Sequence, residues 1–151
     1  MKIVLDNNVL VRAAASPVGP AGALLPLIVP PHFLVFSSDS FRELSEVLCY
    51  EHVRKLHGLS DEGIGDFLHG IQRAALVVSL PDERPPRVVP DDQDDDYVVA
   101  TSLEAKADVL CTRDRHFFHP DVLAYCRTHG VEVMDDLTLL ARLRAAVPHD
   151  E

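Results

Sequence analysis

Short apolar runs alternate along the chain with longer stretches whose apolar positions recur at helical spacing. The runs predict buried strands at residues 2–5, 33–36, 76–80, 109–111 and 131–134. Helices are predicted at residues 21–29, 39–54, 60–74, 94–107, 120–128 and 135–145, and a charged, proline-rich loop at 81–90. Strands that alternate with helices favour a parallel sheet covered on both faces. The expected fold class is therefore α/β, a three-layer sandwich with a central parallel sheet.

Length and composition exclude several classes of protein. The 151 residues predict one domain at 1–147 and a short C-terminal tail at 148–151. No apolar run approaches the ~20 residues of a membrane span. Three cysteines without paired spacing argue against a disulfide framework and fit a reducing cytoplasm. The net charge of −10 argues against a long nucleic-acid-binding surface, although a small site whose carboxylates hold a cation stays open.

Four acidic residues occupy positions that this fold would bring to one edge of the sheet. Asp6 and Asp114 follow two predicted strands, whose carboxyl ends form the binding edge of a parallel sheet. Glu43 and Asp96 lie early in predicted helices. Carboxylates about 5 Å apart repel by roughly 3 kcal/mol per pair at an effective dielectric of about 20. Such a cluster persists when it holds a hard cation such as Mg²⁺ or Mn²⁺, so a metal-dependent enzyme acting on phosphate esters is predicted.

Helical periodicity separates these two acids from their neighbours. Asp96 precedes two positions of the apolar stripe by three and four residues, whereas Asp94 and Asp95 are expected to point elsewhere. A buried carboxylate is costly unless it is paired or bound to a metal, which makes Asp96 the candidate. Glu43 lies at the edge of its stripe, where a side chain can face a cleft, and Glu46 lies almost opposite the stripe.

Simpler roles remain open for each acid. Asp6 and Asp114 suit a helix cap or a turn. Asp94, Asp95 and Asp96 begin the 94–107 helix, where negative charges interact favourably with the helix dipole. His116 and His119 are the one close pair of histidines, and a loop pair without a metal is the simpler interpretation. The convergence of four acids on one predicted edge, rather than any single acid, favours a site.

Four segments share their order and spacing with a known family. They are Val4-Leu5-Asp6-Asn7-Asn8-Val9-Leu10, Ser38 to Leu44, Asp96-Tyr97-Val98-Val99-Ala100 and Thr112-Arg113-Asp114-Arg115-His116-Phe117. The first is similar to a hydrophobic-Asp-Thr-Asn-Val opening and the second to a Ser followed by Glu-Leu. The third is similar to an Asp with Ala four residues later, and the last to a Thr-x-Asp-x-Asp-Phe close. Along nearly its whole length the chain thus resembles the PIN-domain family of metal-dependent ribonucleases.

The resemblance implies a site and a reaction. It implies that Asp6, Glu43, Asp96 and Asp114 are catalytic residues that hold one or two Mg²⁺ or Mn²⁺ ions for hydrolysis of RNA phosphodiester bonds. His116 stands where a further Asp is common, which removes a fifth carboxylate and weakens a second metal site or lets His116 contact a phosphate.

The resemblance also implies partners. It extends to the branch that contains toxins of toxin–antitoxin pairs, which implies a protein antitoxin that inserts a segment into the acidic cleft. Homodimers are common in the family, and the predicted helix at 21–29, apolar nearly all round, is the candidate surface for one.

Five further residues are expected to support this site. Asn8 is a candidate to position a carboxylate or a water, and Thr112 to donate a hydrogen bond to one of the carboxylates. Arg113, Arg115 and Lys106 are weaker candidates for contacts with the RNA backbone, since solvated surface charges are common.

Two other functions compete with the ribonuclease. A haloacid-dehalogenase-like phosphatase would use Asp6 as its nucleophile, but it requires an Asp two residues later, where this chain has Asn8. A catalytically silent binding module of the same fold would bind metal weakly and cleave no RNA. The missing acid at His116 and the net negative charge favour that second alternative slightly.

Overall fold

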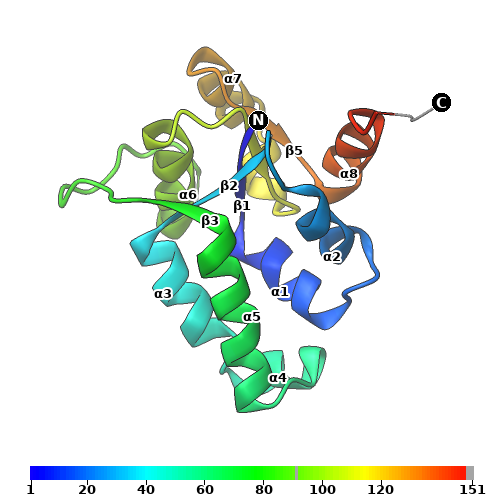
Figure 1. Ribbon diagram of the computed structural model, residues 1–151. Coiled ribbons are helices and arrows are strands. Elements are labelled where there is room, and N and C mark those ends of the chain that lie inside the picture. Colours follow the sequence, from blue (N-terminus) through cyan, green and yellow to red (C-terminus); the bar gives the residue numbers. More distant parts are fainter. Residues whose placement is uncertain (91, 149–151) are drawn as a thin grey trace.

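The structure is a computed structural model that describes residues 1–90 and 92–148 (Figure 1). Its strands are β1 (Lys2–Leu5), β2 (Phe33–Ser37), β3 (Ala75–Val78), β4 (Val109–Cys111) and β5 (Glu132–Met134). Its α-helices are α1 (Asn7–Ala15), α2 (Pro20–Leu24), α3 (Ser38–Val47), α4 (Glu51–His57), α5 (Asp61–Ala74), α6 (Gln93–Glu104), α7 (Pro120–Thr128) and α8 (Asp136–Ala145). Two 3-10 helices, η1 (Leu25–Leu27) and η2 (Arg115–Phe118), complete the described elements.

The strands form one parallel sheet in the order β3-β2-β1-β4-β5. Central strand β1 pairs with β2 on one side and with β4 on the other, where Leu5 is opposite Cys111. This arrangement confirms the predicted α/β fold with a parallel sheet. Because the strands run in the same direction, β1 and β4 end side by side, and the Asp6 N–H donates to the Cys111 carbonyl oxygen at 2.9 Å.

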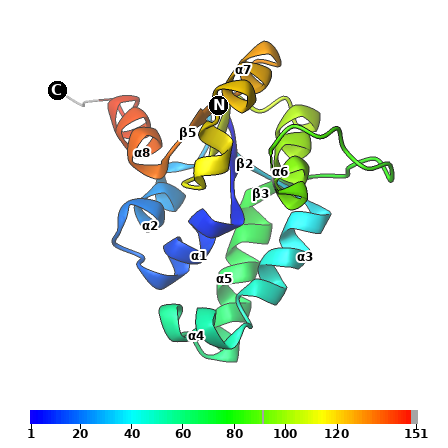
Figure 2. The same cartoon turned by 180° about the vertical axis from the view of Figure 1, so that it is seen from behind.

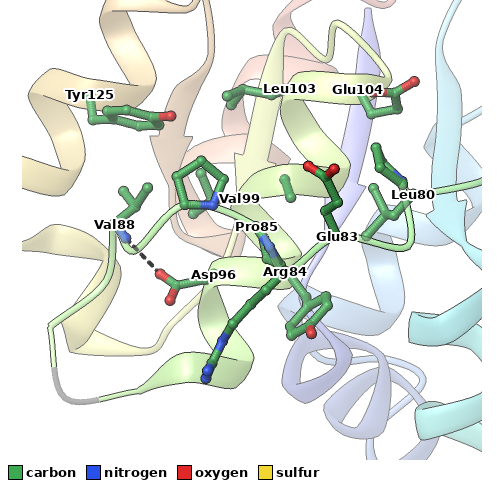
Figure 3. Close-up of a pocket in the computed structure, with 14 residues that line it drawn as sticks. Leu80, Glu83, Arg84, Pro85, Val88, Asp96, Val99, Leu103, Glu104 and Tyr125 are labelled. Carbon is green, nitrogen blue, oxygen red and sulfur yellow. Dashed lines mark hydrogen bonds between the residues drawn. The ribbon is translucent and has the colours of Figure 1, made fainter.

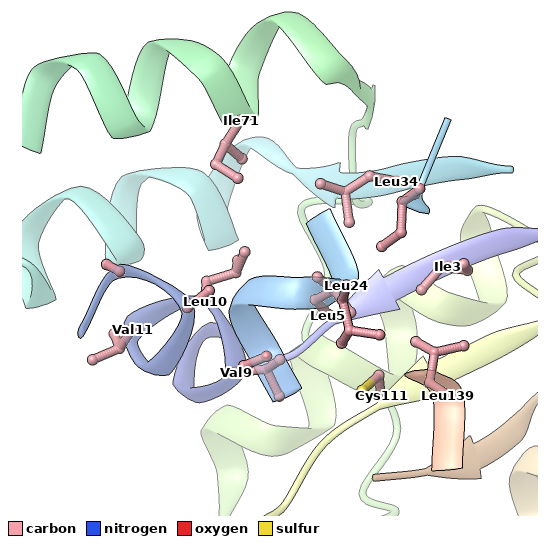
Figure 4. Packing of buried hydrophobic residues seen from close by; sticks show 14 of the residues in the cluster. Ile3, Leu5, Val9, Leu10, Val11, Leu24, Leu34, Ile71, Cys111 and Leu139 are labelled. Carbon is pink, nitrogen blue, oxygen red and sulfur yellow. The ribbon is translucent and has the colours of Figure 1, made fainter. Parts of the chain in front are cut away.

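Successive strand residues face opposite sides of the sheet, and each side is covered by its own helices (Figures 1 and 2). Ile3 and Leu5 of β1 pack into a cluster with residues of α1–α5 and α8, part of which Figure 4 shows. Val4 of β1 and Leu110 of β4 pack on the other side with α6, α7 and η2. The result is the predicted three-layer sandwich.

Three helical segments differ from the prediction. The predicted 39–54 helix is two helices, because the chain turns after Val47 and becomes extended at Tyr50 before α4 begins. The predicted 21–29 helix ends as α2 and continues only as η1, because Pro26 has no N–H to donate to the preceding turn. Helix α1, which the apolar pattern does not predict, follows β1 directly.

The apolar character of the 21–29 segment is explained within the chain. Helix α2 packs against α1 and α8, and Ala21, Leu24 and Ile28 are buried in the core. Part of the apolar surface expected for a homodimer is therefore used for internal packing.

The chain ends and its membrane propensity need only brief description. Helix α8 ends at Ala145, and of the predicted tail only Pro148 lies within the described residues. Among the described helices none is individually long and apolar enough to cross a membrane; a stretch from Asn7–Ala15 to Pro20–Leu27 passes only as a pair bent by 102°.

Candidate metal centre

Asp6 lies at the tip of β1 and is fixed by a residue from the neighbouring strand end. The Thr112 hydroxyl donates to Asp6 Oδ2 at 2.9 Å, and Thr112 Oγ1 in turn accepts the Asp114 N–H at 3.0 Å. Both Asp6 and Thr112 are buried. The predicted hydrogen bond from Thr112 is thus present. Asp6 is the N-cap residue of α1, and the backbone N–H groups of Asn7 and Asn8 at the start of that helix lower its pKa.

Asp114 and three residues near it form a compact group of potential ligands. Asp92, Asp95, Asp114 and His116 each offer a ligand atom, and these atoms lie within 4.8 Å of one another. His116 Nδ1 lies 3.2 Å from Asp114 Oδ1 and 3.9 Å from Asp95 Oδ2. Asp114 also caps η2 through the His116 N–H, so the predicted turn role coexists with its place in the group. His116 lies in η2 and His119 caps α7, as a pair near helix starts would, and His116 is also close enough to the carboxylates to share a cation with them.

Electrostatics ties Asp6 to this group. Burial raises the pKa of Asp95 to about 8, with further increases from Asp92, Asp114 and Asp6 and from a hydrogen bond to Asp114. Burial also raises the pKa of Asp6, which the Thr112 hydrogen bond opposes and Asp114 reinforces. Asp6, Asp95 and Asp114 therefore lie close enough at the carboxyl edge of β1 and β4 to interact electrostatically.

Glu43 of α3 lies at the border of these carboxylates. Partial burial of its carboxyl group raises its pKa first, followed by the charges of Asp94, Asp6, Glu46 and Asp92. The start of α3 is held near β1 because the Asn7 side-chain amide donates to the Ser40 carbonyl oxygen at 3.1 Å. Sequence reasoning had found no such role for Asn7.

Asp96 is not part of the group, contrary to prediction. Its Oδ1 accepts the N–H groups of Val88 and Val89 at 2.8 and 2.7 Å, and Arg87 Nε lies 2.9 Å from Oδ2. Figure 3 shows the Asp96 side chain turned toward Val88, beside a cavity of about 320 Å³ between α6 and the 80–88 segment. Asp96 therefore holds the proline-rich loop onto α6, and its neighbour Asp95 faces the other acids.

Helical periodicity selected Asp96 instead of Asp95 because α6 is buried on more than one side. Asp95 and Asp96 are only 8% and 2% exposed, and Thr101 and Ser102 are buried as well. The Thr101 and Ser102 hydroxyls donate to backbone carbonyl groups one turn earlier, so these polar residues tolerate burial. The assumption that only one apolar face of this helix is buried was therefore wrong. Asp92, which caps α6, was also missed by the sequence analysis. For Asp95 the sequence held one signal: Ser102 lies two turns later on the same face of the helix, and a small polar residue there is compatible with a buried polar face.

The remaining predicted residues lie in different places. Asn8 is exposed at the start of α1. Arg115 lies beside His116 around a shallow hollow, whereas the Arg113 Nε lies 3.3 Å from Asp136 Oδ1. Lys106 lies in the turn that enters β4, at the amino edge of the sheet, because it precedes that strand. The expectation that Lys106 lies near the site is therefore wrong.

The donor set fits a divalent cation. Asp95 Oδ2 and His116 Nδ1 are buried and make no hydrogen bond among the described residues, although His116 Nδ1 lies within ion-pair distance of Asp114 and Asp95. Carboxylates buried this close together carry charge that a bound cation would neutralise. Carboxylate oxygens suit Mg²⁺ and Mn²⁺, and the imidazole nitrogen is better tolerated by Mn²⁺. The Asp/His cluster is compatible with a divalent metal site.

Comparisons with known proteins found a family model and a similar solved structure. A family model for the PIN domain matches residues 2–116. A solved structure of a PilT N-terminus domain protein from the archaeon Sulfolobus solfataricus P2 is similar at 16% sequence identity and a TM-score of 0.49, with 100% of each chain covered. No curated protein matches the chain.

Without metal, the folded protein should lose stability as the pH rises. The pKa of Asp95 is about 8 in the folded state against a usual 3.8, so the folded state holds the proton more tightly than the unfolded chain. Stability is then full below about pH 4 for this group and falls until about pH 8. Each tenfold preference for the protonated form is worth about 1.4 kcal/mol.

Urea unfolding in EDTA at several pH values measures this loss. We expect the unfolding midpoint of wild type to fall between pH 5 and 8, in the range set by the raised pKa of Asp95. The decline should be smaller in Asp95→Asn, which keeps the shape of the side chain without its charge. Equal declines in both proteins would contradict the raised pKa.

Replacement of Asp96 should destabilise the fold. Asp96→Ala removes the acceptor of two backbone N–H groups, one of them on buried Val89, and we expect a loss of about 2–4 kcal/mol in the free energy of unfolding. Asp94→Ala is the matched control, because Asp94 is exposed and lies two residues before Asp96 in the same helix. Its loss should cost under about 1 kcal/mol in the free energy of unfolding. Similar losses for the two variants would rule out the role of Asp96 in holding the loop.

Proposed function

The chain belongs to the PIN-domain family, and on this premise we propose that it is a metal-dependent ribonuclease. The observation that carries the proposal is the convergence of Asp95, Asp114 and His116 on one group of ligand atoms beside Asp6. In the proposed site Asp6, Asp95 and Asp114 replace the set expected from sequence, with Glu43 at its border. Asp95 takes the place given to Asp96.

Asp92, Asp95, Asp114 and His116 would hold the cation, and we favour Mn²⁺ over Mg²⁺ because His116 supplies a nitrogen. The cation, when bound, activates a water for attack on a phosphodiester and screens the charge of the phosphate. Asp6 faces the same space and is the candidate to complete the ligand set.

The side chains of this protein have separable tasks in the proposed reaction. Thr112 fixes the orientation of Asp6 by its hydrogen bond and supports the Asp114 backbone at the same time. Arg115 lies beside His116 and is placed to meet a phosphate of the RNA. Asn8, exposed next to Asp6, remains a candidate to orient a water.

The biological role that we propose is the toxin of a type II toxin–antitoxin pair acting in the cytoplasm. The support is the sequence resemblance, together with the acidic edge described above. Such an edge suits an antitoxin segment that inserts a basic side chain among the carboxylates, because burial of those carboxylates alone is unfavourable. For a homodimer, the exposed part of the 21–29 segment, which includes Val29, stays the candidate surface.

A cleavage assay tests the proposed reaction. A mixed RNA pool is incubated with the wild-type protein in Mn²⁺, Mg²⁺ or EDTA. The same assay is run on Asp95→Asn with Asp94→Asn as its control, and on Glu43→Gln with Glu46→Gln as its control. We expect metal-dependent cleavage by wild type, a loss of at least about 100-fold in Asp95→Asn, and a smaller loss in Glu43→Gln, because these two face the other carboxylates. Asp94 and Glu46 lie outside the ligand group and do not contribute to the raised pKa of Asp6 or Asp95, so their replacement should change the rate little.

The same assay separates the competing functions. A stable wild type that binds Mn²⁺ weakly and cleaves no RNA would support the silent binding module. Cleavage that survives in Asp95→Asn but not in Asp94→Asn would place the site elsewhere on α6. An aspartyl-phosphate at Asp6 would support the phosphatase.

A further inference from the structure

A second group of charges lies on the other side of the β1–β4 junction. Asp136, the first residue of α8, is 0% exposed. Arg12 of α1 places its Nη2 atom 3.2 Å from Asp136 Oδ2, and Arg113 places Nε 3.3 Å from Oδ1. One buried carboxylate therefore joins three segments that are distant in sequence.

Helix capping does not account for this arrangement. The cap of α8 is Asp135, whose side chain accepts the Thr138 N–H at 2.8 Å. Asp136 accepts only the N–H of its neighbour Leu137, at 3.1 Å, in addition to its two arginine contacts. A buried ion pair is also weak evidence for stability, because desolvation offsets most of the attraction. The arrangement is better explained by what it does to the two arginines.

Both guanidinium groups are anchored and yet partly open to solvent. The Arg12 and Arg113 side chains are 37% and 44% exposed, and neither contacts another carboxylate group within 4.0 Å among the described residues. Asp135 influences Arg113 only at longer range, since Arg113 is the smallest cause of the lowered pKa of Asp135. Each guanidinium has five N–H donors, so most of them remain available for an anion.

The pair lies next to the candidate metal centre. Arg113 lies between Thr112, which contacts Asp6, and Asp114, which belongs to the ligand group. Helix α1, which carries Arg12, begins directly after Asp6 and lies on the opposite side of the sheet from α6 (Figures 1 and 2). The arginines and Asp95 thus lie on opposite sides of the β1 tip.

We propose that Arg12 and Arg113, held by Asp136, form a phosphate-binding subsite for the RNA strand beside the metal centre. The inference rests on the proposed ribonuclease function and extends it. A chain with a net charge of −10 must recognise the RNA backbone locally, and two oriented guanidinium forks are the side chains best suited to phosphate oxygens. The subsite reads the backbone, so it contributes affinity without base specificity.

Single arginine variants should keep the fold. After removal of Arg12 or Arg113, Asp136 still has one cationic partner, so no buried charge is left alone. Arg142→Gln is the matched control: Arg142 is 41% exposed and paired with Glu132, which begins β5 at the opposite edge of the sheet. Melting temperatures of all variants establish that each is folded.

RNA binding, rather than cleavage, is the direct test. Fluorescence anisotropy measures binding of a labelled, unstructured RNA of about 12 nucleotides over a salt series, with Ca²⁺ in place of Mn²⁺ and again in EDTA. We expect Arg12→Gln and Arg113→Gln each to weaken binding about three- to tenfold and to reduce the slope of log K against log salt by about 0.7. Arg113→Lys should recover most of the slope, since it restores the charge.

The outcomes distinguish the subsite from the function on which it rests. If wild type binds RNA and both glutamine variants bind as tightly as Arg142→Gln, the subsite is wrong and the ribonuclease proposal stands. If Arg113→Lys binds RNA as weakly as Arg113→Gln, and both keep the salt slope of wild type, the guanidinium of Arg113 has only a structural role. If wild type binds no RNA in either condition, both proposals fail.

Discussion

Repulsion among carboxylates at the carboxyl edge of β1 and β4 is the constraint on which the rest of the site depends. Burial raises the pKa of Asp95 to about 8, and the nearby charges of Asp114 and Asp6 add to this increase; Asp114 also raises the pKa of Asp6. Such an arrangement is unfavourable for the protein alone, since a buried charge needs a partner. A bound divalent cation would make it favourable, and the surrounding contacts keep the carboxylates in place.

Those contacts come from residues that do not belong to the ligand group. Thr112 fixes Asp6 from the end of β4, and Asn7 connects the tip of β1 to the start of α3. On α6, Asp96 binds the backbone at Val88 and Val89. Adjacent residues of one helix thus have different tasks: Asp95 faces the other acids, and Asp96 secures the loop that leads to Asp92. Loss of the Asp95 carboxylate removes a potential ligand, whereas loss of Asp96 removes an attachment of the loop.

The sequence was sufficient for the fold but not for the full site. Apolar runs alternating with helices identified the five parallel strands of the described chain, and strand ends correctly placed Asp6 and Asp114 at one edge. Periodicity could not choose between Asp95 and Asp96, because the 80–88 segment buries a second side of α6 that no local pattern reveals. The pairing of Arg113 with Asp136 was equally out of reach, since it joins residues that only the folded sheet brings together. Lys106 was misplaced because a turn before a parallel strand lies at the edge opposite the site.

Binding of Mn²⁺ to the wild-type protein and to two neighbouring variants tests the central claim most directly. Electron paramagnetic resonance of free Mn²⁺ gives the affinity without any need for a substrate. The account predicts that Asp95→Asn binds Mn²⁺ at least about tenfold more weakly than wild type, because a charged ligand is lost. Folded Asp96→Asn keeps an oxygen that can accept the Val88 and Val89 N–H groups, so it should bind Mn²⁺ with nearly wild-type affinity. Normal binding by Asp95→Asn together with loss in Asp96→Asn would contradict the assignment of the metal centre.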